Sequence, residues 1–380
     1  MAADLKRRVV QTAISAGACA VAVTSAADDA GTRERMLAAF AGEVFATWGY
    51  DEQRANDASS PRSLLPGAES VVCVALAYAT PAPQGRRPLS GRVSNYAWSS
   101  EDYHGKMRTL LRRIAAVLDN EAGVPSTRIA CDTAPLAERA YAERAGMGWV
   151  GKHTNLILPG IGSYVFLGEV VTTLVLEPDE PLRKRCGSCA RCVTACPTGA
   201  LRGDYTIDAR LCISDLTQRR DGIPVEMRPF IGDWIWGCDL CQEACPPTRR
   251  ACPRVDRSFE APDAEHAFPD LQALLSMRAG VFKRRFAKTA MGWRGAAALR
   301  RNAAVALGNE LDRATVPALA RALREDPHPT VRGHAAWALG RIASPQALHA
   351  LRERMHEEPH AQAFEEIKRA LEPFSRNTIV

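Results

Sequence analysis

Eight of the twelve cysteines in this chain lie between Cys186 and Cys245, and no other feature of the sequence constrains the fold as strongly. Cysteines at this density in a chain of 380 residues favour metal binding, because disulfide frameworks are typical of short exported proteins. The run Cys-x2-Cys-x2-Cys-x3-Cys-Pro, which ends at Pro197, is the bacterial ferredoxin pattern. In that pattern three thiolates hold one [4Fe–4S] cube and the fourth ligates a second cube. The sequence therefore predicts two iron–sulfur clusters.

A second cysteine motif supplies the remaining ligands. The run Cys-x2-Cys-x3-Cys-Pro begins at Cys238, but Ile235 stands where a preceding cysteine is expected, so we assign that position to Cys212. Soft, charged thiolates suit iron, whereas a tetrahedral zinc site normally uses two pairs of ligands, which makes zinc the weaker alternative. One cluster is predicted to be held by Cys186, Cys189, Cys192 and Cys245, and the other by Cys196, Cys212, Cys238 and Cys241.

The chain divides into three predicted regions around these motifs. Residues 1–180 mix helix and strand patterns, residues 181–255 are organised by metal, and residues 256–380 are helical. A hydrophobic content of 46% with 24% charged residues is that of a soluble globular protein, and no stretch of 18 apolar residues lacks polar interruptions. Paired clusters beside a larger α/β region favour electron transfer to a second redox centre, with a purely structural role as the alternative.

The first region is predicted to be an α/β sandwich. Helical periodicity covers Tyr103–Leu118, and Pro135 is expected to open a helix that runs to Arg144. At the N-terminus, polar interruptions argue against a secretory signal and favour a helix up to Gly17 followed by a strand. The predicted strands are Ala18–Thr24, Ser70–Tyr78, Arg128–Cys131 and Tyr164–Leu176.

The third region contains an internal repeat. The segment Arg300–Gly308 (RRNAAVALG) matches Arg332–Gly340 (RGHAAWALG) at an offset of 32 residues, and Pro317 and Pro345 follow the two segments. Paired helices that repeat at this length indicate a HEAT-like stack, with a generic helical cap as the alternative.

A basic run leads into this repeat. Eight Lys or Arg and no acidic residue lie from Arg278 to Arg301, within a chain of net charge +6. Such a run is usually a solvated face, but its position beside the repeat helices favours a phosphate-bearing partner. The candidate nucleic-acid contacts are Lys283, Arg284, Arg285, Arg294, Arg300 and Arg301.

Several motifs together resemble one enzyme family, the cobalamin-dependent epoxyqueuosine reductases, which complete queuosine synthesis in tRNA. The segments that carry the resemblance are Asp132–Pro135 with Glu138-Arg139, Ala145–Trp149 with Gly151–Thr154, Phe166–Glu169, Asp208–Ser214, Trp236–Asp239, both cysteine motifs, and Arg301-Asn302 with Ala304–Asn309. The resemblance implies a nitroreductase-like α/β cobalamin-binding domain over residues 1–180. It implies a ferredoxin-like domain with two [4Fe–4S] clusters over 181–255 and a C-terminal α-helical, HEAT-like tRNA-binding domain over 256–380.

The resemblance also implies a reaction. Electrons pass through the clusters to cob(II)alamin and cob(I)alamin, and the epoxide at the tRNA wobble position becomes an alkene with Asp132 as proton donor. Position alone predicts instead that Asp132 caps the helix that follows it. The implied cobalamin contacts are Asp132, Lys152, His153, Leu156, Leu167, Ser214, Cys238 and Asp239. The implied setting is a cytoplasmic monomer, away from membranes, that binds the anticodon stem-loop and takes electrons from a low-potential donor of the ferredoxin or flavodoxin type.

Two departures and two rivals accompany this interpretation. Asp102-Tyr103-His104 begins like the cobalamin signature Asp-x-His-x-x-Gly, but Met107 replaces the glycine, so we do not adopt that motif. The segment 57–62 lacks the basic pattern that often precedes the Leu-Leu-Pro-Gly turn of the family. The rivals are a reductive dehalogenase, which also combines cobalamin with two clusters, and a non-catalytic RNA-binding adaptor whose clusters brace the fold.

Overall fold

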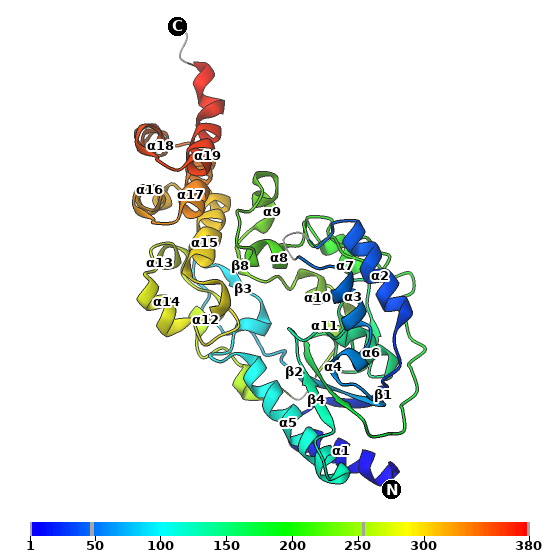
Figure 1. Cartoon of the computed structure of the whole chain (residues 1–380). Coiled ribbons are helices and arrows are strands. Elements are labelled where there is room, and N and C mark those ends of the chain that lie inside the picture. The colour runs from blue at the N-terminus through cyan, green and yellow to red at the C-terminus, as the bar shows by residue number, and fades with distance from the viewer. Residues whose placement is uncertain (1, 46–48, 253–254, 378–380) are drawn as a thin grey trace. The chain divides into compact units, whose positions relative to one another are not determined.

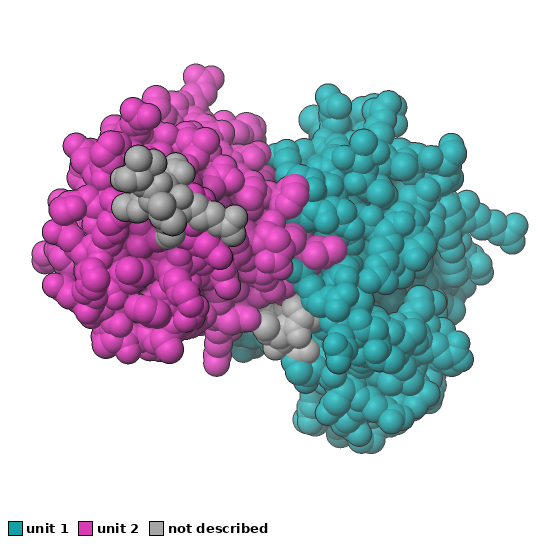
Figure 2. Space-filling view, turned by 90° about the horizontal axis from the view of Figure 1, so that it is seen from above, with its two compact units in different colours: residues 1–80, 102–210, 239–260 teal, residues 81–101, 211–238, 261–380 magenta. Residues whose placement is uncertain are grey.

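The computed structural model describes residues 2–45, 49–252 and 255–377, with the elements labelled in Figure 1. The chain forms two compact units, each assembled from separate segments (Figure 2). Unit 1 comprises residues 1–80, 102–210 and 239–260, and unit 2 comprises residues 81–101, 211–238 and 261–380. The division into three sequence regions stays a prediction. Among the described residues, no helix combines the length and apolar character needed to cross a bilayer.

A four-stranded antiparallel sheet forms the centre of unit 1. Its order is β1-β2-β7-β4, and all eight residues of β2 are buried because helices cover both faces. Helices α1 and α5 pack together, and α5 contacts β7, where a Cβ at Gly168 would lie only 2.8 Å from the Met107 sulfur. Helix α6 packs on the opposite face with the buried Tyr141. The strands are β1 (Ala20–Ser25), β2 (Ser70–Ala77), β4 (Thr127–Ala130) and β7 (Val165–Thr172), with a small pair β5 (Trp149–Val150) and β6 (Leu156–Ile157).

The helices of unit 1 confirm most of the predicted pattern and correct one helix start. Helix α6 begins at Glu138 with Ala137 at its N-cap, so the prediction that Pro135 opens it was wrong by three residues. The idea that Asp132 caps this helix is wrong for the same reason. The helices are α1 (Ala2–Ser15), α2 (Ala30–Ala41), α3 (Glu52–Ala58), α4 (Pro61–Leu64), α5 (Tyr103–Ala122), α6 (Glu138–Arg144), α7 (Arg191–Ala195), α10 (Leu240–Glu243), α11 (Pro246–Arg249) and the 3-10 turn η3 (Arg257–Phe259).

Unit 2 is mainly helical. Its short strands β3 (Arg92–Val93) and β8 (Trp234–Trp236) pair in parallel. The first helices are α8 (Ile213–Gln218), α9 (Arg228–Ile231), α12 (Ala264–Ala267), α13 (Leu271–Leu275) and α14 (Ala279–Arg285). The repeat helices are α15 (Ala296–Glu310), α16 (Val316–Glu325), α17 (Pro329–Ile342), α18 (Pro345–Glu357) and α19 (Ala361–Leu371). The 3-10 turns are η1 (Asn95–Ala97), η2 (Val225–Met227), η4 (Gly292–Arg294), η5 (Arg313–Thr315) and η6 (Glu372–Asn377).

The predicted repeat forms a stack of paired helices. Helices α15, α17 and α19 contact one another in series, and α16 and α18 lie beside them (Figure 1). Two glycines at the same repeat position allow this close approach. A Cβ at Gly308 would lie 2.8 Å from the Ala338 Cα atom, and a Cβ at Gly340 would lie 2.9 Å from the Ala370 Cβ atom.

Buried ion pairs recur with the same period. Arg300 pairs with Asp326 at 2.7 Å, and Arg332, thirty-two residues later, pairs with Glu358 at 2.6 Å. The Glu358 side chain has no exposed area. Each pair joins the start of one helix pair to its end, so the arginines of RRNAAVALG and RGHAAWALG serve the stack itself.

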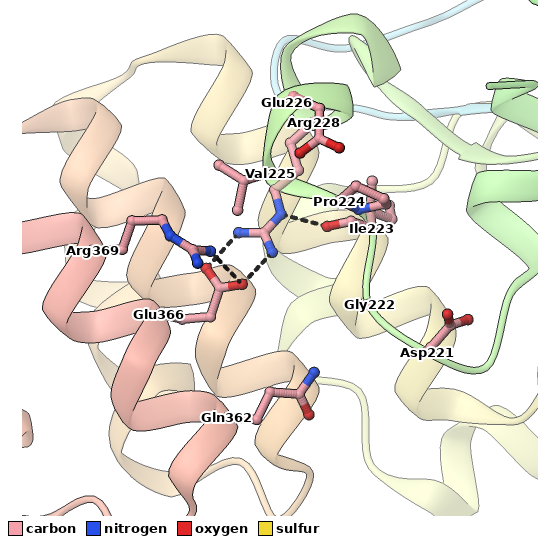
Figure 3. A pocket seen from close by; sticks show the side chains of 10 residues that line it. All are labelled: Asp221, Gly222, Ile223, Pro224, Val225, Glu226, Arg228, Gln362, Glu366 and Arg369. Atoms are coloured by element: carbon pink, nitrogen blue, oxygen red, sulfur yellow. Dashed lines mark hydrogen bonds and ion pairs between the residues drawn. The ribbon is translucent and has the colours of Figure 1, made fainter. Parts of the chain in front are cut away.

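Side chains at a third repeat position contact the segment that runs from α8 to β8. Asn302 donates to the carbonyls of Thr217 and Ile235, and His334 Nε2 accepts the Ile223 N–H at 3.0 Å. Glu366 lies thirty-two residues further on again, and its carboxylate accepts hydrogen bonds from Nη2 and Nη1 of Arg228 at 2.6 and 2.9 Å (Figure 3). The repeat that the sequence reveals in two helices therefore extends to a third, α19.

We predict that Glu358→Gln destabilises the helical stack by about 3–5 kcal/mol, because the change leaves buried arginines without a charged partner. Burial alone would raise the pKa of Glu358, but hydrogen bonds from Arg332, the His360 N–H and Arg354 lower it to about 2. The wild-type advantage should therefore be complete above about pH 4.5 and disappear as the pH falls towards 2. Denaturant unfolding followed by far-ultraviolet circular dichroism measures both effects.

The matched control is Glu325→Gln. Glu325 pairs with Arg324 on the surface, where both side chains are more than half exposed. Its loss should change the free energy of unfolding by less than about 1 kcal/mol. Equal effects of the two substitutions would contradict the assigned role of Glu358.

Candidate active site

Asp132 occupies a strained turn at the end of β4. Its φ is +53°, in the left-handed region that costs a non-glycine residue about 1–2 kcal/mol. The Asp132 N–H donates to Glu138 Oε1 at 2.6 Å, so the first residue of α6 anchors this turn. The Asp132 side chain remains 53% exposed. The backbone therefore holds a carboxyl group outward at a fixed place on unit 1.

His104 connects Asp132 to a second carboxylate. Its Nδ1 lies 2.6 Å from Asp102 Oδ1, and its Nε2 lies 3.1 Å from Asp132 Oδ2. Asp102 is the N-cap of α5 and also accepts the His104 N–H at 3.0 Å, which fixes the start of the helix. The stacked ring of Tyr103 lies 3.8 Å from that of Phe166 on β7 and positions the same helical turn.

The electrostatics of this chain of groups favour a charged imidazole. Hydrogen bonds to Asp102 and then to Asp132 raise the pKa of His104 to about 9, although burial opposes the shift. Burial also opposes the shift of Asp102, but its bonds to His104 lower its pKa. His104 is therefore an imidazolium at neutral pH and can exchange a proton with Asp132.

A buried acid lies in the layer between the sheet and α6. Glu169 on β7 is fully buried, and neither of its carboxyl oxygens has a hydrogen-bond partner among the described residues. Burial and the charge of Glu138 raise the pKa of Glu169 well above its ordinary value. Burial also raises the pKa of Glu138, to about 7. Glu138 and Glu169 are therefore two acids of unit 1 that can retain protons near neutral pH.

Three residues near Asp132 were not predicted as functional candidates from the sequence: His104, Glu138 and Glu169. Met107 occupies the glycine position of the Asp-x-His motif because its side chain fills the core under Gly168, so the motif carries no information here. The sequence signals that could have found two of them are the Asp-x-His pair at a helix start, taken apart from the glycine of the discarded motif, and an acid six residues beyond Asp132.

The implied cobalamin contacts fall in both units. In unit 1, Lys152 is half-buried, and His153 is buried with its Nε2 unpartnered among the described atoms. Burial lowers the pKa of His153 to about 4, so its ring is neutral and its Nε2 requires a polar partner. Leu156 and Asp239 are buried, Leu167 is half-buried, and Ser214 and Cys238 belong to unit 2.

Four of the predicted cluster cysteines gather in unit 1. Burial is the main cause of the raised pKa of Cys192, and the nearby thiols of Cys186 and Cys245 raise it further. Burial also raises the pKa of Cys245, and the thiols of Cys186 and Cys189 add to that rise. Cys186 and Cys245 also pack with Trp149 and Ile157. Among the described residues, no group of three His, Cys, Asp or Glu side chains is arranged around a single ion. These four residues fit the first cluster.

Polar contacts hold the second cysteine motif against the sheet domain. Gln242 on α10 donates to the Ser163 carbonyl at 2.8 Å, and the Ser163 N–H donates to Thr248 Oγ1 at 3.1 Å. Helix α7, which carries Cys192, packs against α10, which carries Cys241. The ligand set of Cys196, Cys212, Cys238 and Cys241 stays a prediction.

The predicted nucleic-acid contacts separate into two groups. Lys283 and Arg284 on α14 are exposed, and Arg285 and Arg294 are half-buried. Arg300 is buried in its pair with Asp326, and the guanidinium of the buried Arg301 donates to carbonyls of residues 216–221. Arg300 and Arg301 therefore have no guanidinium group directed to an RNA phosphate, and we leave both out of the proposed RNA surface.

Comparisons with known proteins match all three parts of the chain. A family model described as epoxyqueuosine reductase QueG matches residues 59–133, a 4Fe–4S double cluster binding domain matches residues 185–248, and HEAT repeats match residues 294–372. An epoxyqueuosine reductase of Bacillus cereus is 38% identical over 297 residues, which are 77% of each chain.

Two solved structures of epoxyqueuosine reductases share the fold of this chain over almost its whole length. A crystal structure of epoxyqueuosine reductase with a tRNA-Tyr epoxyqueuosine-modified stem loop is 33% identical with a TM-score of 0.92, covering 98% of this chain and 99% of that one. The Bacillus subtilis epoxyqueuosine reductase, solved with its catalytic aspartate loop swung out of the active site, is 32% identical with a TM-score of 0.90 over 98% and 99% of the two chains.

These matches define an oxidoreductase with a double 4Fe–4S domain and HEAT repeats. The chain belongs to the epoxyqueuosine reductase family, and it is an enzyme of that kind. Membership also sets aside the dehalogenase and adaptor alternatives.

We predict that a proton titration of His104, followed by nuclear magnetic resonance of labelled histidine, gives a pKa near 9. The stability that this imidazolium contributes should be present below about pH 6.5 and be lost as the pH rises through 9. Asp102→Asn should lower the His104 pKa, while the asparagine preserves the cap of α5. The His104→Asn variant identifies the signal, and a wild-type pKa near 6.5 would contradict the assignment.

We predict that Cys245→Ser removes one ligand of the first cluster and lowers the bound iron after anaerobic purification. Cys252→Ser is the control, because Cys252 is exposed and outside the predicted ligand sets. Iron analysis and visible absorbance measure the result. Equal iron content in the two variants would exclude Cys245 as a ligand.

Proposed function

We propose that this enzyme reduces epoxyqueuosine to queuosine at the tRNA anticodon wobble position with two [4Fe–4S] clusters, cobalamin and Asp132 as proton donor. Membership of the epoxyqueuosine reductase family supports the reaction. The observation that carries the proton-donor role is the outward carboxyl of Asp132, which lies 3.1 Å from the charged ring of His104. The backbone N–H of Asp132 is held by Glu138.

Buried polar groups of unit 1 support the cobalamin proposal. The neutral His153 has an unpartnered Nε2, and it lies beside the half-buried Lys152 in a glycine-containing turn where a polar ligand would satisfy it. The residues that would hold the cofactor are Asp132, Lys152, His153, Leu156, Leu167, Ser214, Cys238 and Asp239. When bound, cobalamin supplies a reducible cobalt nucleophile. The nitroreductase-like description of its domain stays part of this proposal.

The residues of the chain manage the protons. Conversion of the epoxide to an alkene and water consumes two electrons and two protons. Asp132 donates one proton to the oxygen as the ring opens, and the adjacent His104 imidazolium returns a proton to Asp132. Asp132 then donates this second proton to the departing hydroxyl, which leaves as water. The relative from Bacillus subtilis, whose catalytic aspartate loop is swung out, supports a catalytic role for the corresponding turn here. The hydrogen bond to Glu138 fixes the backbone of this turn.

The cysteines define the proposed electron path. An external low-potential donor of the ferredoxin or flavodoxin type would supply the electrons. Cys186, Cys189, Cys192 and Cys245 would hold the first cluster, and the second would be held by Cys196, Cys212, Cys238 and Cys241. When bound, the two clusters would supply single-electron transfer towards the cofactor. The double cluster domain matched over residues 185–248 supports the presence of two clusters, because all eight cysteines lie inside it.

The RNA surface is proposed to include α14 and η4. Lys283, Arg284, Arg285 and Arg294 supply positive charge for the phosphates of the anticodon stem-loop, so binding should weaken as salt is added. The tRNA stem loop bound to a relative 33% identical to this chain supports the partner. Because the substrate is a tRNA, we propose a cytoplasmic location, and we propose that the enzyme acts as a monomer.

We predict that Asp132→Asn lowers turnover of epoxyqueuosine-containing tRNA by about 10²–10⁴-fold, because the amide cannot donate the required proton. Nucleoside analysis for queuosine measures the product, and iron and corrinoid content should match the wild type. Asp51→Asn is the control, since Asp51 only caps α3 and asparagine caps equally well. Full activity of Asp132→Asn would remove this residue from the mechanism.

A further inference from the structure

A basic hollow opens on unit 2 between the segment that follows α8 and the start of the repeat stack. Its volume is about 330 Å³, which is within the range of small-ligand sites. Arg220 and Trp293 on its wall are exposed. The complete lining is Arg219, Arg220, Trp293, Arg294, Ala297, Ala298, Arg301, His328 and Thr330. Trp293 and Arg294 belong to η4 at the edge of the proposed RNA surface, and the other lining residues lie outside it.

Trp293 offers an aromatic surface in a fixed orientation. Its side chain is 52% exposed although it is among the largest apolar groups of the chain. The ring packs edge-to-face on the buried Trp236, with centroids 6.2 Å apart and an angle of 86°. The Arg294 guanidinium lies 3.8 Å from the Trp293 centroid. An exposed, braced tryptophan with a stacked arginine is the arrangement that binds unstacked bases.

The charges around the hollow favour an anion. Arg219 is tied to Asp215 at 2.6 Å, and Asp221 is the second acid near Arg294. Four arginines line the hollow, so two acids leave an excess of positive charge. Burial, followed by the charge of Arg220, lowers the pKa of Arg294. Burial also lowers the pKa of His328, which leaves the arginines as the charged groups.

A second hollow of unit 2 provides an internal comparison (Figure 3). Its volume is about 630 Å³, and it also contains arginines. There Glu366 accepts two bonds from Arg228 and lies 3.7 Å from Arg369, while Asp221 and Glu226 add negative charge to the lining. Its cations are used inside the protein, and it has no aromatic wall. The smaller hollow also has two engaged arginines, Arg219 and Arg301, but it adds the exposed Arg220 and the aromatic wall of Trp293, so it suits an anionic ligand that carries an aromatic ring better.

We propose that the smaller hollow binds one unpaired nucleotide of the tRNA, with the base against Trp293 and the phosphate against Arg220 and Arg294. This inference rests on the proposed function, in which tRNA is the substrate, and it assigns a nucleotide-binding site where the basic run meets Arg220 of the segment that follows α8. The volume accommodates a single nucleotide, and stacking makes the site tolerant of base identity. The site would orient the anticodon loop by contacts distant from the reacting base.

The test measures binding of a fluorescently labelled, unmodified anticodon stem-loop RNA by anisotropy over a range of salt concentrations. Trp293→Ala should weaken binding about 5- to 100-fold, and Trp293→Phe should restore part of the loss because it preserves a stacking surface. Arg220→Ala should reduce the slope of log K against log salt by about one, because one phosphate contact is lost. A fully paired RNA duplex should show no dependence on Trp293.

Arg321→Ala is the matched control, because Arg321 is exposed on α16 and outside the hollow. Circular dichroism verifies the fold, and Arg220→Ala tests an exposed position if Trp293→Ala is unstable. Unchanged affinity in Trp293→Ala, or a salt slope in Arg220→Ala equal to that of Arg321→Ala, would overturn the proposal. If the wild type converts epoxyqueuosine-containing tRNA and these variants bind RNA normally, only this site is refuted. A wild type that neither binds nor converts tRNA refutes the proposed function as well.

Discussion

Thiolate ligation is the constraint on which the middle of this chain depends. The helices that carry or flank the cysteines, α7, α10 and α11, are only four or five residues long. Isolated helices of this length are not stable in water. The apolar cluster around Cys245 contains only a few side chains. Gln242 donates a hydrogen bond to the Ser163 carbonyl, and Thr248 accepts one from the Ser163 N–H, so both contacts fasten the segment to the sheet domain. A double cluster domain supplies the remaining cohesion, because metal ligation then replaces an apolar core.

The sequence predicted features whose signals are local. The buried strand Ser70–Ala77 is a continuous apolar run, and the repeat RRNAAVALG is visible because both copies must pack small residues closely. The start of α6 was misplaced because Pro135 is compatible with a first helical turn, whereas the chain uses residues 132–137 to form the Asp132 turn. The partners of Arg300 and Arg301 were not predictable, because Asp326 and the carbonyls of residues 216–221 reach them only through tertiary packing.

The candidate active site shows the same limit. The residue type and motif of Asp132 were visible, but its contacts come from separate places: Glu138 from α6 and His104 from α5. The left-handed backbone of Asp132 has no glycine to signal it. Glu169 lies in an apolar strand, where a single acid gives no spacing pattern, yet its full burial makes it one of the most costly residues of the sheet. A site of this kind is defined by the mutual placement of charges, which a linear sequence does not encode directly.

The repeat stack also has a consequence for how the enzyme can diversify. Asn302, His334 and Glu366 occupy one equivalent position in α15, α17 and α19, and each forms hydrogen bonds with the segment that runs from α8 to β8. The glycines and arginines that bind the helices to one another occupy other positions of the same period. Different positions of the 32-residue repeat thus serve helix–helix packing and contact with the segment that leads to Cys238. Substitutions at one set of positions can therefore change one function while the other is retained.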